Sequence, residues 1–337
     1  MDIFRVFDSL NWVENMRVAM DAVLEAGGVC EGTICYTADL FDESRPKYNL
    51  AYYVNMAKQL EKAGAHILGI KDMAGVCRPR AARELVKALK NEVGIPLHFH
   101  THDTSGIAAA SVLAAVEAGC DAVDGALDAM SGLTSQPNLG SIAAALEGSA
   151  RDPQIDLGAL RELSDYWEGV RRYYAPFEAD IRSGTGDVYN HEMPGGQYTN
   201  LFRGDLGFAA DGWPQALQQK VLNGQSPLTD RPGATLPPVD LEAARAEAEE
   251  AVGYKLSDSD LSSYLLYPKV YSDFAKARTL YGDLAELPTP AFFYGLREHE
   301  EISVDIDKGK TLVIRLQGST EIEEEGVVKL FFELNGQ

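Results

Sequence analysis

Three histidines at alternating positions form the strongest chemical signal in the sequence. His98, His100 and His102 lie in the segment HFHTHDTSG, residues 98–106. Side chains two residues apart on a strand point to the same face, so the three imidazoles would project together. A His-x-His pair at a strand end often presents two imidazoles to one cation, although a hydrogen-bonded polar cluster is an equal alternative. We predict that His100 and His102 bind a divalent metal and that the deeper His98 belongs to a polar cluster.

Lys71 ends the preceding predicted strand, in the segment GIKDMAG. Inside a barrel its ammonium group would be desolvated, which lowers a lysine pKa and favours the neutral amine. A neutral amine can add CO₂ to form a carbamate, whose anionic oxygen would help two imidazoles to hold a dication. We predict Lys71 as a metal ligand and catalytic residue; the alternative is a salt bridge to Asp8 or Asp72. Asp8 is the second predicted catalytic residue, as an outer partner that orients a ligand, or else it caps the helix that follows from Val13.

Five strand–helix units are expected to position these residues. Before residue 150, apolar β-rich runs alternate with helical patterns, and most of these helices end near a glycine, as left-handed helix caps do. The five strands are predicted at residues 3–11, 28–36, 65–72, 96–102 and 122–128.

Repeated units of this kind build a parallel sheet, either doubly wound or closed into a barrel. No G-x-G-x-x-G motif follows any predicted strand, so nothing supports a dinucleotide crevice. Polar residues gather instead at the carboxyl ends of the strands, where barrels place their active sites. The predicted fold class is therefore α/β, of the (β/α)8 TIM-barrel type. It is a partial barrel, because eight units close a barrel and five are found; the other three would most naturally precede residue 1.

Several segments resemble the carboxyltransferase domain of biotin-dependent carboxylases. The match follows the same order along essentially the whole chain, and its C-terminal half is similar to pyruvate carboxylases in particular. The matching segments are RVFDSLN (5–11), CYT (35–37), RPKY (45–48), KDMAG (71–75), HFHTHDTSG (98–106), SGLTSQPNLG (131–140), HEMPGGQYTN (191–200), YPKV (267–270), LPTPAFFYG (287–295), DKGKTLVI (307–314) and FFELNGQ (331–337).

The resemblance implies a barrel, a C-terminal helical funnel and a small β domain that helps to form a homotetramer. On this basis we expect a partial barrel at residues 1–150, the funnel at 151–298 and the β-rich region at 299–337. In the family, a carboxylated lysine, two histidines and an aspartate hold zinc or manganese; motif matching assigns the first three to Lys71, His100 and His102. The implied reaction transfers CO₂ from carboxybiotin to pyruvate, which gives oxaloacetate through an enolate.

The sequence also departs from the family pattern. The R-D-x-H-Q-S stretch that carries the fourth ligand is absent, as is the A-M-K-M lysine of the biotin-carrier domain. Between Arg203 and Gly204 the chain omits several helices of the family, which predicts an internal deletion. The competence of this chain alone is therefore open. Two alternatives remain: a non-catalytic remnant or oligomerisation fragment, and a related metal-dependent decarboxylase or lyase.

Composition excludes several other classes of function. The formal net charge of −21 repels nucleic acid and anionic membranes, and no apolar run is long enough to span a membrane. We expect a cytoplasmic, soluble protein with no nucleic-acid or membrane partner and with four buried, reduced cysteines. The aromatic residues between Tyr166 and Tyr174 recur at helical spacing, which favours a place in the core.

Overall fold

The computed structural model describes residues 1–43, 46–178, 183–191, 215–226, 232–234, 236–320 and 326–337. The chain divides into two compact units, Met1–Thr235 and Leu236–Gln337. The finer division predicted at residues 150 and 298 stays a prediction. The predicted deletion point at Arg203 and Gly204 lies outside the described residues, as does most of the matching segment at 191–200.

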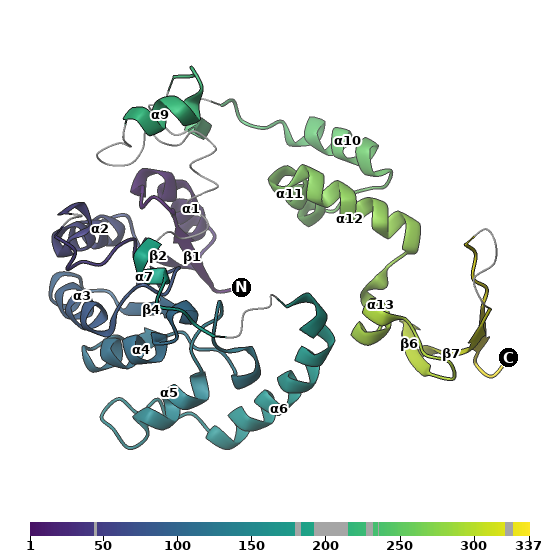
Figure 1. Cartoon of the computed structure of the whole chain (residues 1–337). Coiled ribbons are helices and arrows are strands. Elements are labelled where there is room, and N and C mark those ends of the chain that lie inside the picture. Colours follow the sequence, from purple (N-terminus) through teal and green to yellow (C-terminus); the bar gives the residue numbers. More distant parts are fainter. Residues whose placement is uncertain (44–45, 179–182, 192–214, 227–231, 235, 321–325) are drawn as a thin grey trace. The chain divides into compact units, whose positions relative to one another are not determined.

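The first unit is built on a parallel sheet with the strand order β1-β2-β3-β4-β5, which follows the chain (Figure 1). The strands are β1 (Ile3–Phe7), β2 (Val29–Cys35), β3 (Ile67–Asp72), β4 (Leu97–Thr101) and β5 (Ala122–Val123). The helices are α1 (Val13–Glu25), α2 (Leu50–Lys62), α3 (Pro79–Glu92), α4 (Ala108–Glu117), α5 (Leu139–Leu146), α6 (Leu157–Tyr174), α7 (Val188–His191) and α9 (Gln215–Leu222). The five strand–helix units predicted from the sequence are therefore confirmed.

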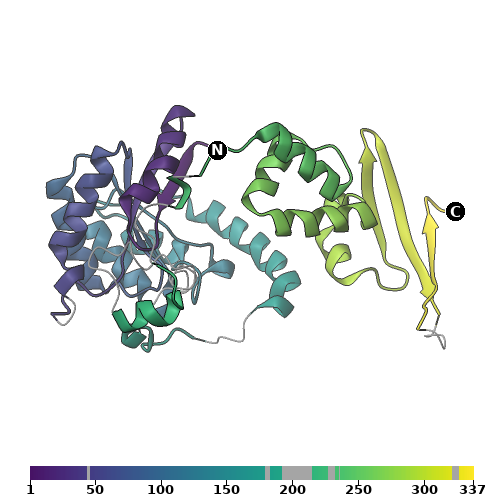
Figure 2. The same cartoon turned by 90° about the horizontal axis from the view of Figure 1, so that it is seen from above.

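Alternate residues of the strands serve the two faces of the sheet. One face packs against the helices, and its fully buried side chains join one continuous core with them; these include Ile34, Leu68, Ile70, Leu97 and Phe99. Figure 2 shows helices α1 to α4 together on this side of the strands. Because side chains alternate along a strand, the opposite face receives a polar set: Arg5, Glu31, Lys71, His98 and His100.

Within the described residues the sheet is open, with β1 and β5 at its edges. Strand β5 is shorter than predicted: residues 122–128 were expected, but only Ala122 and Val123 pair with β4. An edge strand has a single neighbour, so pairing ends where the backbone turns away from it. Beyond this point one isolated parallel bridge joins Ala126 to Asn138.

The second unit contains a helical cluster and a small antiparallel sheet. Its helices are α10 (Leu241–Val252), α11 (Asp258–Leu266), α12 (Pro268–Tyr281) and α13 (Thr289–Tyr294). The sheet, with the order β6-β7-β8, is formed by β6 (Glu301–Asp307), β7 (Lys310–Ser319) and β8 (Leu330–Leu334). These strands agree with the small β region predicted near the C-terminus.

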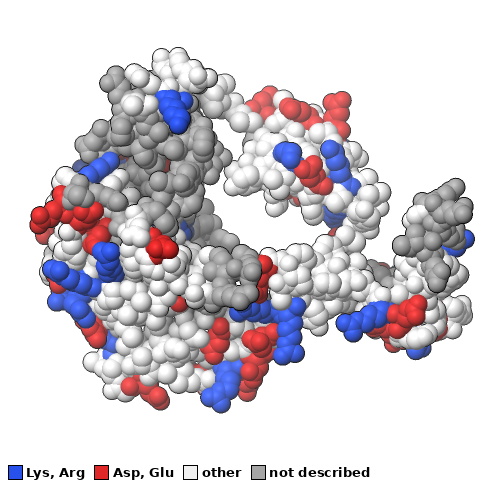
Figure 3. Space-filling model, in the orientation of Figure 1, with Lys and Arg blue, Asp and Glu red and all other residues white. Residues whose placement is uncertain are grey.

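The surface and the cysteines also test predictions from the sequence. All four cysteines are buried and free, as expected. On the face shown in Figure 3, acidic and basic side chains are interspersed over both units, which is typical of solvated surface. The prediction of a buried aromatic cluster on α6 is wrong, because Tyr166 is 64% exposed and Trp167 is 38% exposed. Helical spacing alone cannot say whether a partner element covers a face. No described helix is both long and apolar enough to cross a membrane.

Candidate metal centre

The strand register places the predicted metal ligands side by side. Lys71 of β3 pairs directly with His100 of β4, and Cys35 of β2 pairs with Lys71. His102 lies just beyond the end of β4, where its backbone N–H bonds the carbonyl oxygen of Asp72 at 3.3 Å. The structure therefore brings Lys71, His100 and His102 to the same end of adjacent strands.

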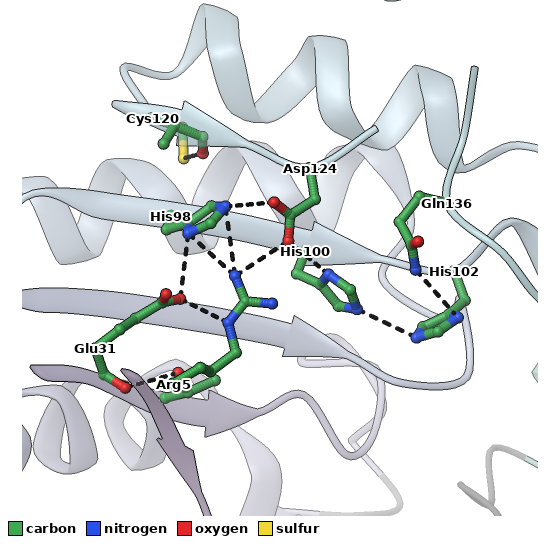
Figure 4. Close-up of polar contacts among 10 residues, drawn as sticks. Arg5, Glu31, His98, His100, His102, Cys120, Asp124 and Gln136 are labelled. Carbon is green, nitrogen blue, oxygen red and sulfur yellow. Dashed lines mark hydrogen bonds and ion pairs between the residues drawn. The ribbon is translucent and has the colours of Figure 1, made fainter. Parts of the chain in front are cut away.

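The two histidines face each other through their Nε2 atoms, which lie 3.2 Å apart (Figure 4). The Nδ1 atom of His100 is 2.7 Å from a carboxylate oxygen of Asp124. The Nδ1 atom of His102 is 2.6 Å from the carbonyl oxygen of Thr134. Both of these partners only accept hydrogen bonds, so each neutral imidazole carries its proton on Nδ1. Two Nε2 lone pairs then point at each other, an arrangement that a shared cation would stabilise.

The separation of these nitrogens fits such a cation. Zn²⁺–N bonds are about 2.0–2.1 Å long, so two imidazole ligands of a tetrahedral ion lie about 3.3 Å apart. In the part of the chain that the structure describes, no three His, Cys, Asp or Glu side chains gather as a metal site. The residue that pairs with His100 on the neighbouring strand is Lys71, whose charge acts on the His100 imidazole.

Lys71 lies in an environment that shifts the pKa of its amine downward. Burial lowers the pKa of Lys71, and the positive charge of Arg5 lowers it further. Its Nζ atom lies 4.8 Å from the centre of the Phe7 ring. Within the described residues, Lys71 forms no ion pair with Asp8 or Asp72 that would keep it charged, which argues against the salt-bridge alternative.

A cluster of charged side chains lies behind the two histidines on the same face of the sheet. Arg5 Nε donates to Glu31 Oε1 at 3.0 Å, and Arg5 Nη2 donates to Asp124 Oδ2 at 3.1 Å. His98 lies between the two carboxylates, with Nδ1 at 3.2 Å from Glu31 and Nε2 at 2.8 Å from Asp124. This geometry confirms the polar-cluster interpretation of His98.

The cluster strongly perturbs the ionisation of its members. Burial opposes charge on His98, but hydrogen bonds to Asp124 and Glu31 raise its pKa to about 9. Burial also opposes charge on Asp124, yet hydrogen bonds from His100 and His98 hold the pKa of this carboxyl far below its usual range. For His100, burial dominates and lowers the pKa, which favours the neutral imidazole that a metal requires.

The remaining predicted residue, Asp8, lies in a local turn. Its Oδ1 accepts hydrogen bonds from the backbone N–H groups of Leu10 and Trp12, and its Oδ2 accepts one from Asn15. These contacts fix the turn that leads into α1, but neither backbone donor belongs to the helix, which begins at Val13 and has no side-chain cap hydrogen bond. A catalytic role for Asp8 stays a prediction.

Three residues of the site were missed by sequence reasoning: Arg5, Glu31 and Asp124. A signal for the first two existed, because they occupy the same alternating positions of their strands as Lys71 and His100 do. Asp124 follows directly after the short strand β5. Its contact with His100 depends on how β5 lies against β4, which local sequence does not reveal.

Two glycines allow close approach around the site. A Cβ atom on Gly69 would lie 2.3 Å from Thr33 Oγ1 and 2.6 Å from Glu31 Oε1. Gly75 has φ +72°, and a Cβ atom there would lie 2.3 Å from the His102 carbonyl oxygen. The absence of a side chain at Gly69 therefore lets the Glu31 carboxylate approach β3. The absence of a side chain at Gly75 lets the His102 backbone approach the turn that follows β3.

Comparison with known proteins agrees with this architecture. Residues 12–166 match the family described as HMGL-like, and residues 200–315 match the conserved carboxylase domain. The carboxyl transferase domain of Rhizobium etli pyruvate carboxylase superposes with a TM-score of 0.91 at 47% identity, over 100% of this chain and 69% of that one. The chain belongs to the carboxyltransferase-domain family of pyruvate carboxylases.

Other members of this carboxyltransferase family show the same relationship. A structure of the R. etli domain with pyruvate and biocytin gives a TM-score of 0.92 at 47% identity, with the same coverage of both chains. Pyruvate carboxylase of Bacillus subtilis is 42% identical over 410 aligned residues, which include 100% of this chain and 36% of the relative. The chain thus spans just over a third of that relative. Because the alignment has more positions than the chain has residues, the relative carries internal residues that have no counterpart here.

Proposed function

We propose that this chain is the carboxyltransferase part of a biotin-dependent pyruvate carboxylase. The reaction moves a carboxyl group from the ring nitrogen of carboxybiotin to C3 of pyruvate: the N–C bond breaks, a C–C bond forms, and a proton passes from C3 to biotin. Family membership supports this assignment. The structural observation that carries it is the pair of His100 and His102 Nε2 atoms, 3.2 Å apart at the carboxyl end of a parallel sheet in which His100 pairs with Lys71.

We further propose that Lys71, His100 and His102 hold a divalent cation, zinc or manganese. The imidazoles would supply two nitrogen ligands, and the acceptors beside their Nδ1 atoms favour the tautomer that leaves Nε2 free. When bound, the cation would polarise the substrate carbonyl and stabilise negative charge that develops on its oxygen.

Lys71 supplies the third ligand through a covalent change in this proposal. The neutral amine attacks CO₂, a C–N bond forms and one proton is released, which leaves a carbamate with an anionic oxygen. Burial of Lys71 and the nearby Arg5 charge support this step, because both favour the neutral amine that must attack.

The proposal includes partners beyond this chain. Pyruvate and carboxybiotin are the substrates, and the biotin is carried on a domain outside this sequence. We also propose that the second unit contributes to a homotetramer, since its antiparallel sheet occupies the region that resembles a tetramerisation domain.

Metal content of the purified full chain tests the metal assignment. Elemental analysis is expected to find about one zinc or manganese ion per chain, and much less in the His100→Ala and His102→Ala variants. His299→Ala is the matched control, because this exposed histidine lies in the second unit. A wild-type chain without metal, or equal loss in the control, would refute the assignment.

The lysine is tested by two substitutions with opposite expectations. Lys71→Ala should lose metal, whereas Lys71→Glu should recover part of the binding because its carboxylate replaces the carbamate oxygen. If the glutamate variant holds no more metal than the alanine variant, the carbamate proposal is wrong.

Carboxyl transfer is tested in the reverse direction, as loss of oxaloacetate that depends on added biotin. A metal-bound chain that never shows this reaction would contradict the assigned activity.

A further inference from the structure

One carboxylate connects the predicted metal ligand His100 to the charged cluster behind it. Asp124 Oδ2 lies 2.7 Å from His100 Nδ1 and 3.1 Å from Arg5 Nη2, and Asp124 Oδ1 lies 2.8 Å from His98 Nε2 (Figure 4). We infer that Asp124 is a positioning residue of the metal centre, which holds the His100 imidazole so that its Nε2 lone pair faces the cation. This inference rests on the proposed function, because it requires that His100 binds a metal.

The hydrogen-bond roles in the cluster leave one arrangement for His100. The Arg5 guanidinium can only donate, so Asp124 Oδ2 accepts from it. An ionised carboxylate has no proton of its own to give, so it must also accept from His100 Nδ1. The proton of a neutral His100 imidazole is therefore on Nδ1, and Nε2 is left with a free lone pair.

The position of Asp124 is itself set by several contacts. Its backbone N–H donates to the carbonyl oxygen of Phe99 at 3.1 Å, which extends the pairing of β4 and β5 by one residue. Its side chain is 30% exposed and accepts hydrogen bonds from Arg5 of β1 and from His98 and His100 of β4. A carboxylate that binds three donors has little freedom to rotate away from the imidazole.

The two histidine ligands differ in what supports them. His102 Nδ1 donates to a neutral backbone carbonyl, that of Thr134. His100 Nδ1 donates to a charged carboxylate, which makes the opposite ring nitrogen a stronger donor to a metal. Removing a carboxylate that accepts a hydrogen bond from a metal-binding histidine typically weakens metal affinity by about 10–100-fold.

The test compares metal affinity among variants of the full chain, by chelator competition with Zn²⁺ and Mn²⁺. Asp124→Asn has the shape of the carboxylate but one accepting oxygen for three donors, and Asp124→Ala removes the partner entirely. Both are expected to bind metal about 10–100-fold more weakly than wild type. Asp121→Asn is the matched control, since this carboxylate also lies beside β5 but bonds Lys90 and the backbone N–H of Leu97 instead of a predicted ligand. Its metal affinity is expected to be unchanged.

A second measurement separates positioning from simple support of the fold. In the metal-free chain, ¹⁵N NMR of the histidine rings reports which nitrogen carries the proton. His100 should be protonated on Nδ1 in the wild type and should become a mixture of tautomers in Asp124→Ala. This wild-type measurement remains decisive even if the alanine variant fails to fold.

The outcomes distinguish this inference from the proposed function. A wild-type chain that binds no metal refutes the metal assignment itself. A wild-type chain that binds metal, while folded Asp124 variants bind it equally well, overturns only the role of Asp124. Protonation of wild-type His100 on Nε2, or equal weakening in the Asp121→Asn control, would also overturn it.

Discussion

Gly69 offers a sharp test of how tightly the inner face of the sheet is packed. The change Gly69→Ala adds one methyl group to β3, where it faces the side chains of Thr33 and Glu31 on β2. That methyl carbon would lie 2.3 Å from Thr33 Oγ1 and 2.6 Å from Glu31 Oε1, far inside van der Waals contact. The backbone at Gly69 lies in a strand without positive φ, so the expected cost is steric and does not come from the backbone conformation.

The size of the effect follows from what must move. Overpacking a well-packed region costs about 1–3 kcal/mol. Glu31 is only 3% exposed and is bound to Arg5 and His98, so its carboxylate cannot swing into solvent. Displacing one member of a buried ion pair costs about 3–5 kcal/mol. We expect partial displacement, and a loss of about 3 kcal/mol in the free energy of unfolding.

Urea unfolding of the first unit, followed by circular dichroism, measures this loss. Gly169→Ala in α6 is the matched control, because a Cβ atom there meets nothing within 4 Å. The same substitution in an open helical site should stabilise the protein by up to about 1 kcal/mol. In the background of Thr33→Ala, which removes the nearest atoms, Gly69→Ala should cost less than it does alone.

An unchanged midpoint in Gly69→Ala would refute the reasoning. So would an equal loss at Gly69 and Gly169, since that would trace the effect to glycine itself and not to the packing around Glu31.

Two further predictions concern elements that hold the site. Asn11 has φ +59°, and its side chain bonds both the N–H and the carbonyl oxygen of Cys35 at the end of β2. Asn11→Ala should lower the melting temperature more than Asn11→Gly does. Both variants lose the two hydrogen bonds, but glycine tolerates the backbone conformation. An equal effect of both variants would show that the backbone conformation carries no cost. Asp156 caps α6 by accepting from Gly158 and Ala159, so Asp156→Ala should destabilise the chain by about 1 kcal/mol in urea unfolding, and a loss below about 0.3 kcal/mol would contradict this capping role.

Much of the first unit could be predicted from the sequence because its signals are local. Alternation of apolar and polar residues identifies a strand, and glycine after a helical pattern marks its end. These rules located all five strands and the polar residues at their carboxyl ends. The same period of two placed His98, His100 and His102 on one face, and the expected desolvation of Lys71, together with resemblance to a known family, predicted Lys71 as a further ligand of the proposed metal site.

Tertiary structure decided the features that depend on contacts between distant segments. Sequence spacing predicted a buried aromatic face on α6, yet Tyr166 is largely exposed, since burial requires a partner that spacing does not specify. Asp8 could orient a ligand or cap a helix, but it accepts hydrogen bonds from the backbone N–H groups of Leu10 and Trp12, which form the turn before α1.

The charged cluster is the clearest case of this division. Arg5, Glu31, His98 and Asp124 come from four strands or their ends, and their separation in sequence reaches 119 residues. Each is an ordinary polar residue in its own segment. The parallel register of β1 to β5 brings these charges within hydrogen-bonding distance, and so places His100 Nδ1 against Asp124 and leaves Nε2 for the proposed cation.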